Sequence, residues 1–501
     1  AHPDYVAQYS EAGLFAPILP VIDNALKSRY KRKILATLQH TPDNIYLRYA
    51  ALFITSTPDE AAKTLRALKL DNKTVNTVSK LVELSKMDIE ETEPAVRTAL
   101  NKYGRDFLPL WHELMMAVIQ AVGFFYGHGA GNYISRMLGA KEVEKAKKMA
   151  ATGFILSFLT GLFIAILGQL FLTPLCVLLG STPTIQPYTE RYLGIILLGA
   201  PFMTTSLTLN NQMRFQGNAM YAMKGIMSGV LLNLILAPLL ILYFAMGITG
   251  AAIATLISQC FGCAMLFWMS HKGQNIRIHL HNFTPTRAYF KEIIFGGTPS
   301  LSRQGLGSIA TLVLNVAAGA YGDAAIAGMS IVTRISFFTY AVVIGLGQGF
   351  QPLCGFCYGA KLYDRVKEAF FFCIKCGTVF LAVCAVFGFL FSEPIIELFR
   401  DDASVVAVGS VALKWQVISF PLVATIVLTN MLMQTIRKPV RANIVAAARS
   451  GLFFIPLIFI LPHFFGLLGV EMCQAWADIC SFLVAIPIAW SAFRDMKFQK
   501  R

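Results

Sequence analysis

The sequence predicts an all-α polytopic membrane protein, with two pseudo-symmetric lobes of six helices, the first lobe truncated, and a soluble helical segment before them. Three observations predict this fold class. Hydrophobic residues make up 55% of the 501 residues and charged residues only 14%, which is typical of membrane proteins. Apolar runs of about 20 residues recur from residue 113 onward. Part of the first half of the chain is also repeated in the second half.

Eleven apolar stretches are long enough to cross a bilayer as helices. They cover residues 113–135, 149–172, 190–212, 224–244, 250–270, 297–318, 325–356, 368–391, 405–435, 442–461 and 468–493. Residues 1–113 hold no comparable stretch and are expected to form a soluble helical segment. The remaining sequence divides into a first lobe at 114–271, a cytoplasmic linker at 272–296 and a second lobe at 297–501.

The formal charge of +15 could indicate a nucleic-acid partner, so its position matters. Residues 1–113 carry 15 Lys and Arg against 14 acidic residues, and the rest of the chain carries 28 against 14. The excess therefore belongs to the membrane part, where nearly all basic residues fall in alternate connections. This positive-inside pattern places the connections near 141–148 and 272–291, and the C-terminus, in the cytoplasm.

An internal repeat organises the membrane part. GQGFQPLCGFCYGAK at 347–361 aligns without gaps with GHGAGNYISRMLGAK at 127–141, an offset of 220 residues. At the same offset Pro201 meets Pro421 and Asn210 meets Asn430. The second copy has six spans, so both copies share one orientation, with a pseudo-two-fold axis along the membrane normal and a cavity between the lobes.

The repeat also exposes a missing element. Subtracting 220 from the first helix of the second copy, 297–318, gives 77–98, TVSKLVELSKMDIEETEPAVRT. This segment is too polar to cross a membrane. The first lobe is therefore expected to lack its first helix.

Two site motifs in the repeat are set aside. Four cysteines have zinc-ribbon spacing, but the residues aligned with the first pair in the other copy are Ile134 and Met137, and the cysteines flank or enter spans. The glycines at 345–349 suggest a phosphate loop, but no strand precedes them. We expect no metal and interpret the glycines as helix-packing residues. The four cysteines are Cys354, Cys357, Cys373 and Cys376.

Polar groups inside predicted spans are candidates for function because they are costly in lipid. Arg303, with Gln304 and Asn315, makes the first helix of the second lobe the most polar one there. Gln348 and Gln351 either line a cavity or bond between helices. Arg334, Lys414 and Arg449 are candidates that could instead snorkel or pair structurally. Asp478 is the one convincing membrane-embedded carboxylate of the second lobe.

From about residue 118 onward the chain resembles the multidrug and toxic compound extrusion (MATE) family. The motifs that carry the resemblance are GFFYGHGAGNYISRMLGAK, LNNQMRFQGNAMYA, GITGAAIATLISQ, IVTRISFF, GQGFQPLCGFCYGAK and NMLMQTI. The resemblance implies a two-lobe, non-enzymatic exporter in the bacterial inner membrane, without a cofactor. It would exchange organic cations or other amphipathic compounds for Na⁺ or H⁺, and we expect it to be monomeric.

The resemblance also implies a coupling site in the first lobe. Asn233 and Thr255 match an Asn and a Thr of the family's ion site, and Gln259 closes the same motif as Thr255. Ala237 stands where many members have an Asp, and the family's first-helix Asp has no counterpart here. Without these carboxylates the second lobe would have to supply the coupling group.

Residues 1–113 resemble the C-terminal helical part of bacterial tRNA nucleotidyltransferases, through LRYAALF, LRALKLDNKTVNTVSKLVE and AVRTALNKYGRDF. Ile54 and Thr55 replace a His-Asp pair, so neither phosphohydrolase nor CCA-adding activity is expected. KSRYKRK at 27–33 could contact RNA phosphates, but we favour a solvated helix face. Two alternatives to transport stay open: a membrane-tethered RNA-binding module, and a transport-dead fusion or gene fragment.

Overall fold

The computed structural model describes residues 108–178 and 186–500, and within the first 107 residues a set between 22 and 82 that includes 56–68. The described residues form helices joined by short connections, and there is no strand among them. The chain divides into two compact units, residues 1–106 and 107–501.

The helices of the second unit are α8 (Leu108–Gly139), α9 (Val143–Leu170), α10 (Leu172–Leu178), α11 (Gln186–Leu198), α12 (Ala200–Phe215), α13 (Ala219–Pro238), η1 (Leu239–Tyr243), α14 (Gly247–Ser270), η2 (Leu280–Asn282), α15 (Arg287–Gly319), α16 (Asp323–Gly359), α17 (Tyr363–Leu390), α18 (Ser392–Phe399), α19 (Ala403–Thr435), α20 (Pro439–Ala447), η3 (Ala448–Leu452), α21 (Phe454–Phe465) and α22 (Leu467–Lys500).

Helices stand at all eleven predicted span positions. Within the described residues, eight helices are long and apolar enough to cross a membrane, or nine if α11 and α12, bent by 44°, count as one span. The two others, α8 and α15, are not among these spans but have similar lengths of 32 and 33 residues. The prediction of an all-α polytopic membrane protein is therefore confirmed. Helix α15 begins at Arg287, so residues 287–296 of the predicted linker are helical.

The two copies of the repeat have the same local backbone geometry. Lys141 and Lys361 both end a helix with a positive φ, 63° and 59°. Such angles are uncommon for residues other than Gly. The side-chain amide of Asn210 donates to Ala222 O at 3.0 Å, and that of Asn430 donates to Ala442 O at 2.7 Å. These equivalent features at an offset of 220 confirm the internal repeat.

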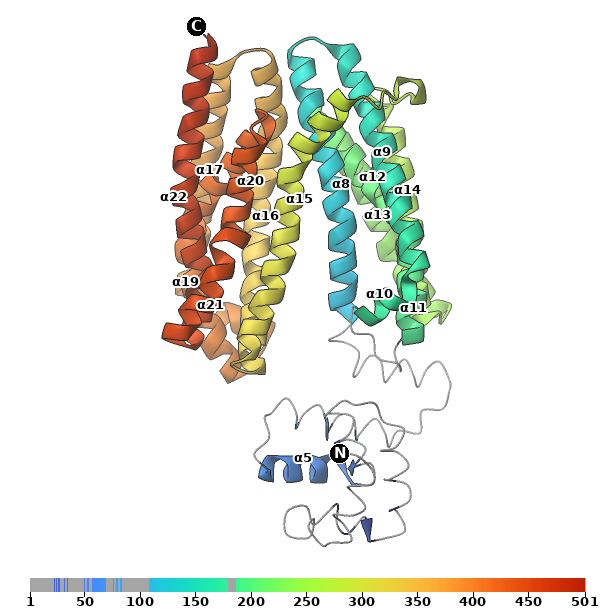
Figure 1. The fold of residues 1–501 in the computed structure, drawn as a ribbon, viewed down its shortest axis with the longest axis vertical. Coiled ribbons are helices and arrows are strands. Elements are labelled where there is room, and N and C mark those ends of the chain that lie inside the picture. Colours follow the sequence, from blue (N-terminus) through green and yellow to red (C-terminus); the bar gives the residue numbers. More distant parts are fainter. Residues whose placement is uncertain are drawn as a thin grey trace. The chain divides into compact units, whose positions relative to one another are not determined.

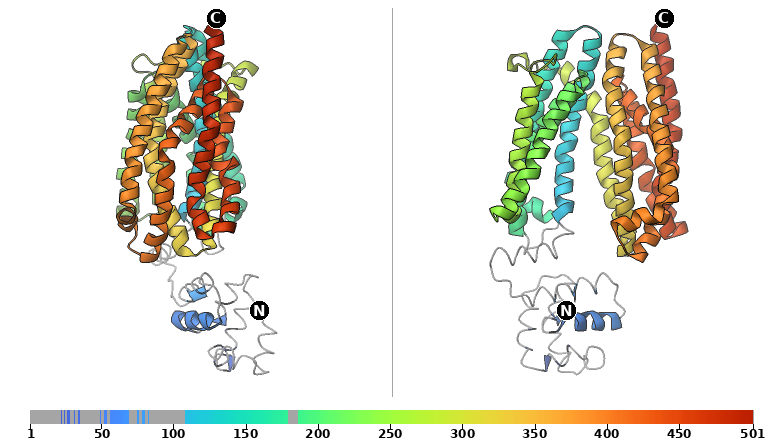
Figure 2. Two further views of the ribbon diagram at one scale, coloured as in Figure 1. Left: turned by 90° about the vertical axis from the view of Figure 1, so that its left-hand side faces the viewer. Right: turned by 180° about the vertical axis from the view of Figure 1, so that it is seen from behind.

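The second unit consists of two helical lobes, α8 to α14 and α15 to α22 (Figure 1). They pack together through α8, α15, α16 and α12, with additional contact between α8 and α19. The side chains on the outward faces of both lobes are apolar and exposed, as expected for lipid-facing helices. Helices α8 and α15 lie close together at one end and diverge toward the other, and Figure 2 shows the same separation of the lobes from behind.

The first unit has a small apolar core of its own. It contains helix α5 (Pro58–Ala67), whose start is fixed by a capping box between Thr57 and Glu60. Ile54, Thr55 and most of the basic segment 27–33 lie outside the described residues. The buried core residues are Ile22, Leu26, Ile34, Leu52, Phe53, Ala61, Leu65, Val75, Val78 and Val82.

Candidate functional site

An ion-pair cluster joins the lobes at the end where they meet. Glu292 of α15 accepts from Arg136 of α8 at 2.7 Å and pairs with Arg437, after α19, at 2.6 Å. Arg136 also donates to Thr435 O at 2.9 Å. Arg136 and Glu292 are both buried. Because a buried charge is costly without its partner, this cluster favours contact between the lobes. Sequence reasoning missed Glu292 because it fell in the predicted linker.

Two glycines let the lobes approach at the same end. A Cβ added to Gly139 would collide with the carbonyl oxygen of Phe356, and one added to Gly359 would collide with the carbonyl oxygen of Arg136. The two contacts are equivalent under the 220-residue repeat. The backbones of α8 and α16 therefore meet symmetrically, at a distance that only glycine permits.

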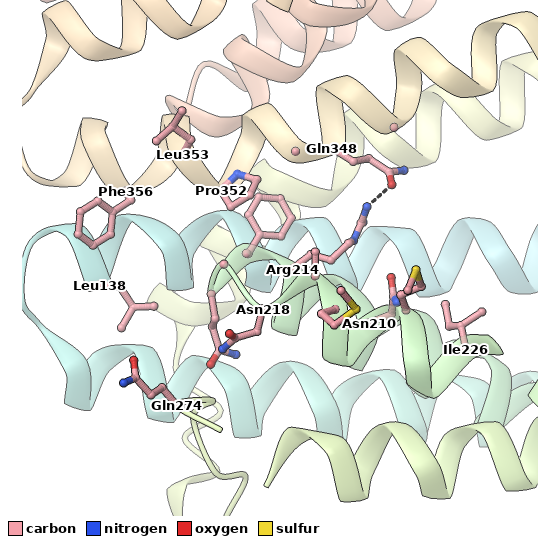
Figure 3. A pocket seen from close by; sticks show the side chains of 18 of the residues that line it. Leu138, Asn210, Arg214, Asn218, Ile226, Gln274, Gln348, Pro352, Leu353 and Phe356 are labelled. Atoms are coloured by element: carbon pink, nitrogen blue, oxygen red, sulfur yellow. Dashed lines mark hydrogen bonds between the residues drawn. The ribbon is translucent and has the colours of Figure 1, made fainter. Parts of the chain in front are cut away.

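Polar side chains continue this contact between the lobes. Arg214 of α12 donates to Gln348 of α16 (Figure 3). It also donates to Asn211 of its own helix. Gln351, completely buried, donates to Gln434 of α19 at 3.1 Å. The glutamines singled out from the sequence thus differ: Gln348 bonds to the other lobe and lines a groove, whereas Gln351 bonds within its own lobe.

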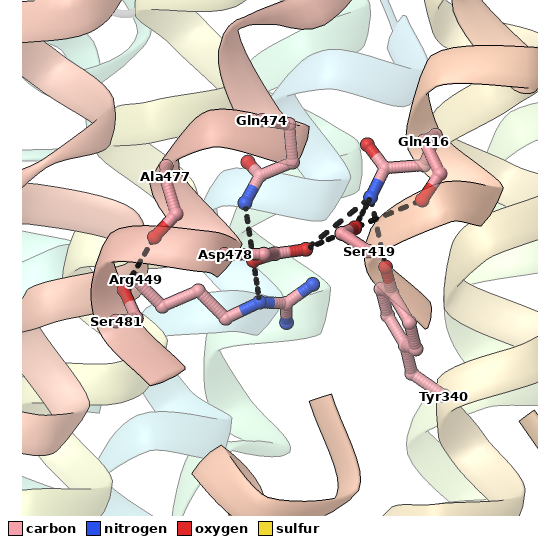
Figure 4. A network of polar contacts seen from close by, with 8 residues as sticks. All are labelled: Tyr340, Gln416, Ser419, Arg449, Gln474, Ala477, Asp478 and Ser481. Carbon is pink, nitrogen blue, oxygen red and sulfur yellow. Dashed lines mark hydrogen bonds and ion pairs between the residues drawn. The ribbon is translucent and has the colours of Figure 1, made fainter. Parts of the chain in front are cut away.

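A second polar cluster lies inside the second lobe, around the fully buried Asp478 of α22 (Figure 4). Its Oδ1 accepts from Arg449 Nε at 2.7 Å and from Gln474 at 3.0 Å. Its Oδ2 accepts from Ser419 at 3.0 Å and from Gln416 at 3.3 Å. Four donors therefore satisfy a carboxylate that lipid and protein shield from water.

Arg449 connects this cluster to a cavity. Its guanidinium lies 4.4 Å from the centre of the Tyr340 ring, within cation–π distance. Tyr340 also accepts from Gln416 at 2.9 Å. Arg449 sits on the π-helical segment η3, a form of helix that often occurs at functional sites. Arg449, Tyr340, Gln416 and Gln474 line a cavity of about 240 Å³, while Asp478 lies behind them.

Among the described residues, the other candidates of the second lobe lie outside this cluster. Arg303 donates to Asn430 at 3.3 Å, which ties α15 to α19. Gln304 and Asn315 are half-buried on α15, and neither side chain forms a hydrogen bond with the residues that the structure describes. Arg334 is exposed, and Lys414 lies 3.5 Å from Glu393. Of the ionisable groups singled out from the sequence, Asp478 and Arg449 are brought together.

The first-lobe candidates form no comparable cluster. Thr255 donates to Ala251 O of its own helix at 2.9 Å. Gln259 packs against Gly199 and donates weakly to the Met203 sulfur at 3.8 Å. The Oδ1 atom of Asn233 is buried without a hydrogen-bond partner among the described residues. Since Ala237 offers no carboxylate, these groups include no titratable side chain.

The cysteines with zinc-ribbon spacing pack with apolar side chains. Cys354, Cys357 and Cys373 belong to one core cluster with Phe350 and Phe370. Cys376 is exposed. Within the described part of the chain, no group of three or more His, Cys, Asp or Glu side chains is placed to hold a metal ion.

Comparison with known proteins agrees with this architecture. The family model MatE matches residues 114–239 and 299–460. The chain is 30% identical over 371 residues to the multidrug export protein MepA of Staphylococcus haemolyticus, covering 74% of this chain and 82% of that protein. It is also 30% identical over 380 residues to MepA of Staphylococcus aureus strain N315, covering 75% and 83% respectively.

Solved structures have the same fold. A crystal structure of a MATE protein in the bent conformation superposes with a TM-score of 0.74 at 23% identity, covering 90% of this chain and 98% of that one. The outward-facing conformation of a multidrug resistance MATE family transporter gives 0.72 at 22% identity, covering 89% and 98%. The chain belongs to the MATE family.

Proposed function

We propose that this protein is a secondary active multidrug exporter, which exchanges organic cations or other amphipathic compounds for an inward-moving cation and is not an enzyme. The proposal rests on family membership and on 30% identity to proteins named multidrug export proteins. The two-lobe architecture supports it, because two repeats that meet at one end can alternate access by rocking about a central site.

The observed conformation fits one state of such a cycle. The Arg136–Glu292 pair and the Gly139 and Gly359 contacts all lie where α8 and α15 approach each other. The basic connection at 139–143 lies at the same end of α8, and by the positive-inside rule that end faces the cytoplasm. The proposed orientation puts the C-terminus inside a bacterial plasma membrane and makes this the outward-open state, with a monomer as the transporting unit.

The single observation that carries the coupling mechanism is the buried Asp478 paired with Arg449. With Asp478 ionised, the pair is neutral and a cationic substrate meets no net charge in the cavity. Protonation of Asp478 removes the negative charge and leaves Arg449 positive at the cavity wall, where it repels a cation. A proton arriving from outside would therefore promote release of the substrate.

We propose H⁺ rather than Na⁺ as the coupling ion at this site. A bound Na⁺ would share the carboxylate with the Arg449 guanidinium, which already occupies Oδ1 at 2.7 Å. Two adjacent cations at one buried carboxylate repel each other strongly in a low-dielectric interior. A proton avoids this repulsion because it neutralises Asp478.

The test is efflux of ethidium, a fluorescent organic cation, from vesicles that carry the full chain. An imposed pH gradient should drive efflux, a proton ionophore should abolish it, and replacing Na⁺ with choline should leave the rate unchanged. Efflux driven by a Na⁺ gradient alone would contradict the proton mechanism. No efflux under either gradient would contradict the transporter proposal itself.

For residues 1–113 we propose a separate helical module derived from the tRNA nucleotidyltransferase C-terminal region. The apolar core of its described residues supports independent folding. We do not expect it to bind RNA. If it did, tRNA affinity measured by filter binding would fall when Lys31, Arg32 and Lys33 are neutralised, and such a result would favour the tethered-module alternative.

A further inference from the structure

A groove of about 1050 Å³ runs between α12 and α13 of the first lobe and α16 of the second. Figure 3 shows Asn210, Arg214 and Ile226 on one wall and Gln348, Leu353 and Phe356 on the other. No acidic side chain lines the groove among the described residues. The groove is separate from the Asp478 cluster, which lies inside the second lobe.

The first wall of the groove matches a surface that a helix covers in the second lobe. There, Gln434 donates to Gly296 O and to Ser300 of α15, at 2.5 and 2.8 Å. Asn430 accepts from Arg303 of α15, and Asn443 accepts from Ser302. At the repeat offset of 220, Gln434, Asn430 and Asn443 correspond to Arg214, Asn210 and Met223. All three line the groove.

The opposite wall matches as well. In α8, Phe125, His128 and Gly129 contact Gly297 and Gly296 of α15. A Cβ on Gly296 would lie 2.9 Å from the Gly129 Cα, so these two helices meet backbone to backbone. Adding 220 gives Gly345, Gln348 and Gly349, which line the groove on α16. A Cβ on Gly345 or Gly349 would meet nothing within 4 Å.

We propose that this groove is the docking site for one membrane-spanning helix supplied by a second polypeptide, seated as α15 is seated in the second lobe. The repeat relates both walls of the groove to the two surfaces that hold α15. Residues 77–98, at the corresponding place in the chain, are too polar to provide such a helix. A helix about 10 Å wide that rises 1.5 Å per residue would fill the groove with roughly two to three turns.

The chemistry of Arg214 specifies the occupant further. Its described hydrogen-bond partners, Gln348 and Asn211, are neutral, and its Nε is buried without a partner among the described residues. In the second lobe the equivalent Gln434 needs only a carbonyl and a hydroxyl from α15. A guanidinium prefers a carboxylate. The docked helix should therefore have small residues facing Gly345 and Gly349, and an acidic residue facing Arg214.

Helix α15 itself supplies the probe. A fluorescent peptide of residues 287–319 would be prepared with Ser300→Asp and with Ser300→Lys, because Ser300 is the side chain that faces Gln434. Binding to the purified full chain would be measured by fluorescence anisotropy in detergent. The Ser300→Asp peptide should bind at least about 10-fold more tightly than the Ser300→Lys peptide, as expected for a charge-assisted hydrogen bond.

Two chain variants identify the binding surface. Gly349→Trp should weaken binding of the Ser300→Asp peptide at least about 10-fold, because the indole would occupy the part of the groove where the peptide helix packs. Gly305→Trp is the matched control, since Gly305 is also an exposed helical glycine with nothing within 4 Å and lies on α15, outside the groove. It should change the affinity less than about two-fold. Thermal unfolding would verify that both variants fold.

Equal affinity for the two peptides, or an unaltered affinity in Gly349→Trp, would overturn the proposal. So would native mass spectrometry that finds a lipid retained by the chain, lost in Gly349→Trp, with no peptide binding, because a lipid would then be the occupant. The readout is binding alone, so it does not depend on the proposed transport activity.

Discussion

Arg449 and Asp478 form an ion pair inside the second lobe, with 2.7 Å between Nε and Oδ1, although they are 29 residues apart on separate helical segments. The Asp478 side chain is fully buried, whereas 24% of the Arg449 side chain is exposed. The carboxylate is therefore hidden while its cationic partner faces a cavity. In the proposed mechanism, a proton can change the charge of the cavity wall without occupying the cavity.

Asp478→Asn should abolish proton-driven efflux, because an amide cannot take up and release a proton as the carboxylate does. It should also lower the free energy of unfolding by about 2 kcal/mol, less than for a fully buried pair because Arg449 is partly exposed. Efflux and thermal unfolding would be measured on the same preparation. The double variant with Arg449→Gln should regain stability but not coupling. Wild-type efflux in Asp478→Asn would rule out Asp478 as the coupling group.

Glu292→Gln should loosen the contact between the lobes. It removes the carboxylate that holds both Arg136 and Arg437, and the Arg136 pair is buried on both sides. We expect a loss of about 3 kcal/mol in the free energy of unfolding. Glu144→Gln is the control, because its Lys147 pair is exposed and should contribute little. If both variants unfold at the same temperature, the Glu292 cluster does not stabilise the contact between the lobes.

Gly139→Ala and Gly359→Ala should impair transport to the same extent, because each methyl group would strike a backbone carbonyl of the opposite lobe. Each should slow ethidium efflux by about 10-fold, a barrier increase of about 1.4 kcal/mol. Gly305→Ala is a suitable control because a Cβ there meets nothing within 4 Å and Gly305 does not line the cavity beside Arg449. A large effect at only one of the two positions would contradict a symmetric closed contact.

Thr255→Val and Asn233→Ala should leave efflux within about two-fold of wild type, since neither residue titrates and no carboxylate accompanies them. Among the described residues, the Thr255 hydroxyl donates to Ala251 O of its own helix and to no other helix. Initial efflux rates under a pH gradient would be compared with those of Asp478→Asn. Loss of coupling in both first-lobe variants, with Asp478→Asn active, would move the coupling site to the first lobe.

Much of the fold could be predicted from the sequence because its signals are local. Apolar runs mark the helices, and an offset of 220 marks the repeat, which the paired φ values at Lys141 and Lys361 confirm. The exact helix starts were less predictable. The first turns of α15, which begin at Arg287, were predicted to be linker because they are polar and precede the apolar run.

The candidate site was only partly predictable. Asp478, Arg449 and Arg303 were conspicuous as charges within apolar sequence. Their partners were not, since Gln416, Ser419 and Tyr340 are ordinary residues of other helices until packing brings them together. Arg214 was overlooked because it lies two residues beyond the end of the predicted span 190–212.

The sequence by itself determined which segments are apolar and that they form two copies, because composition and self-similarity need no contacts. It also predicts that one copy lacks a helix. Only the tertiary structure decided which polar groups meet. Arg449 turned toward Asp478 and Arg303 toward Asn430, although both arginines look alike along the chain. It also showed that Gly129 is covered while its copy Gly349 is open. Such differences arise from how helices pack across long sequence separations, which no local pattern records.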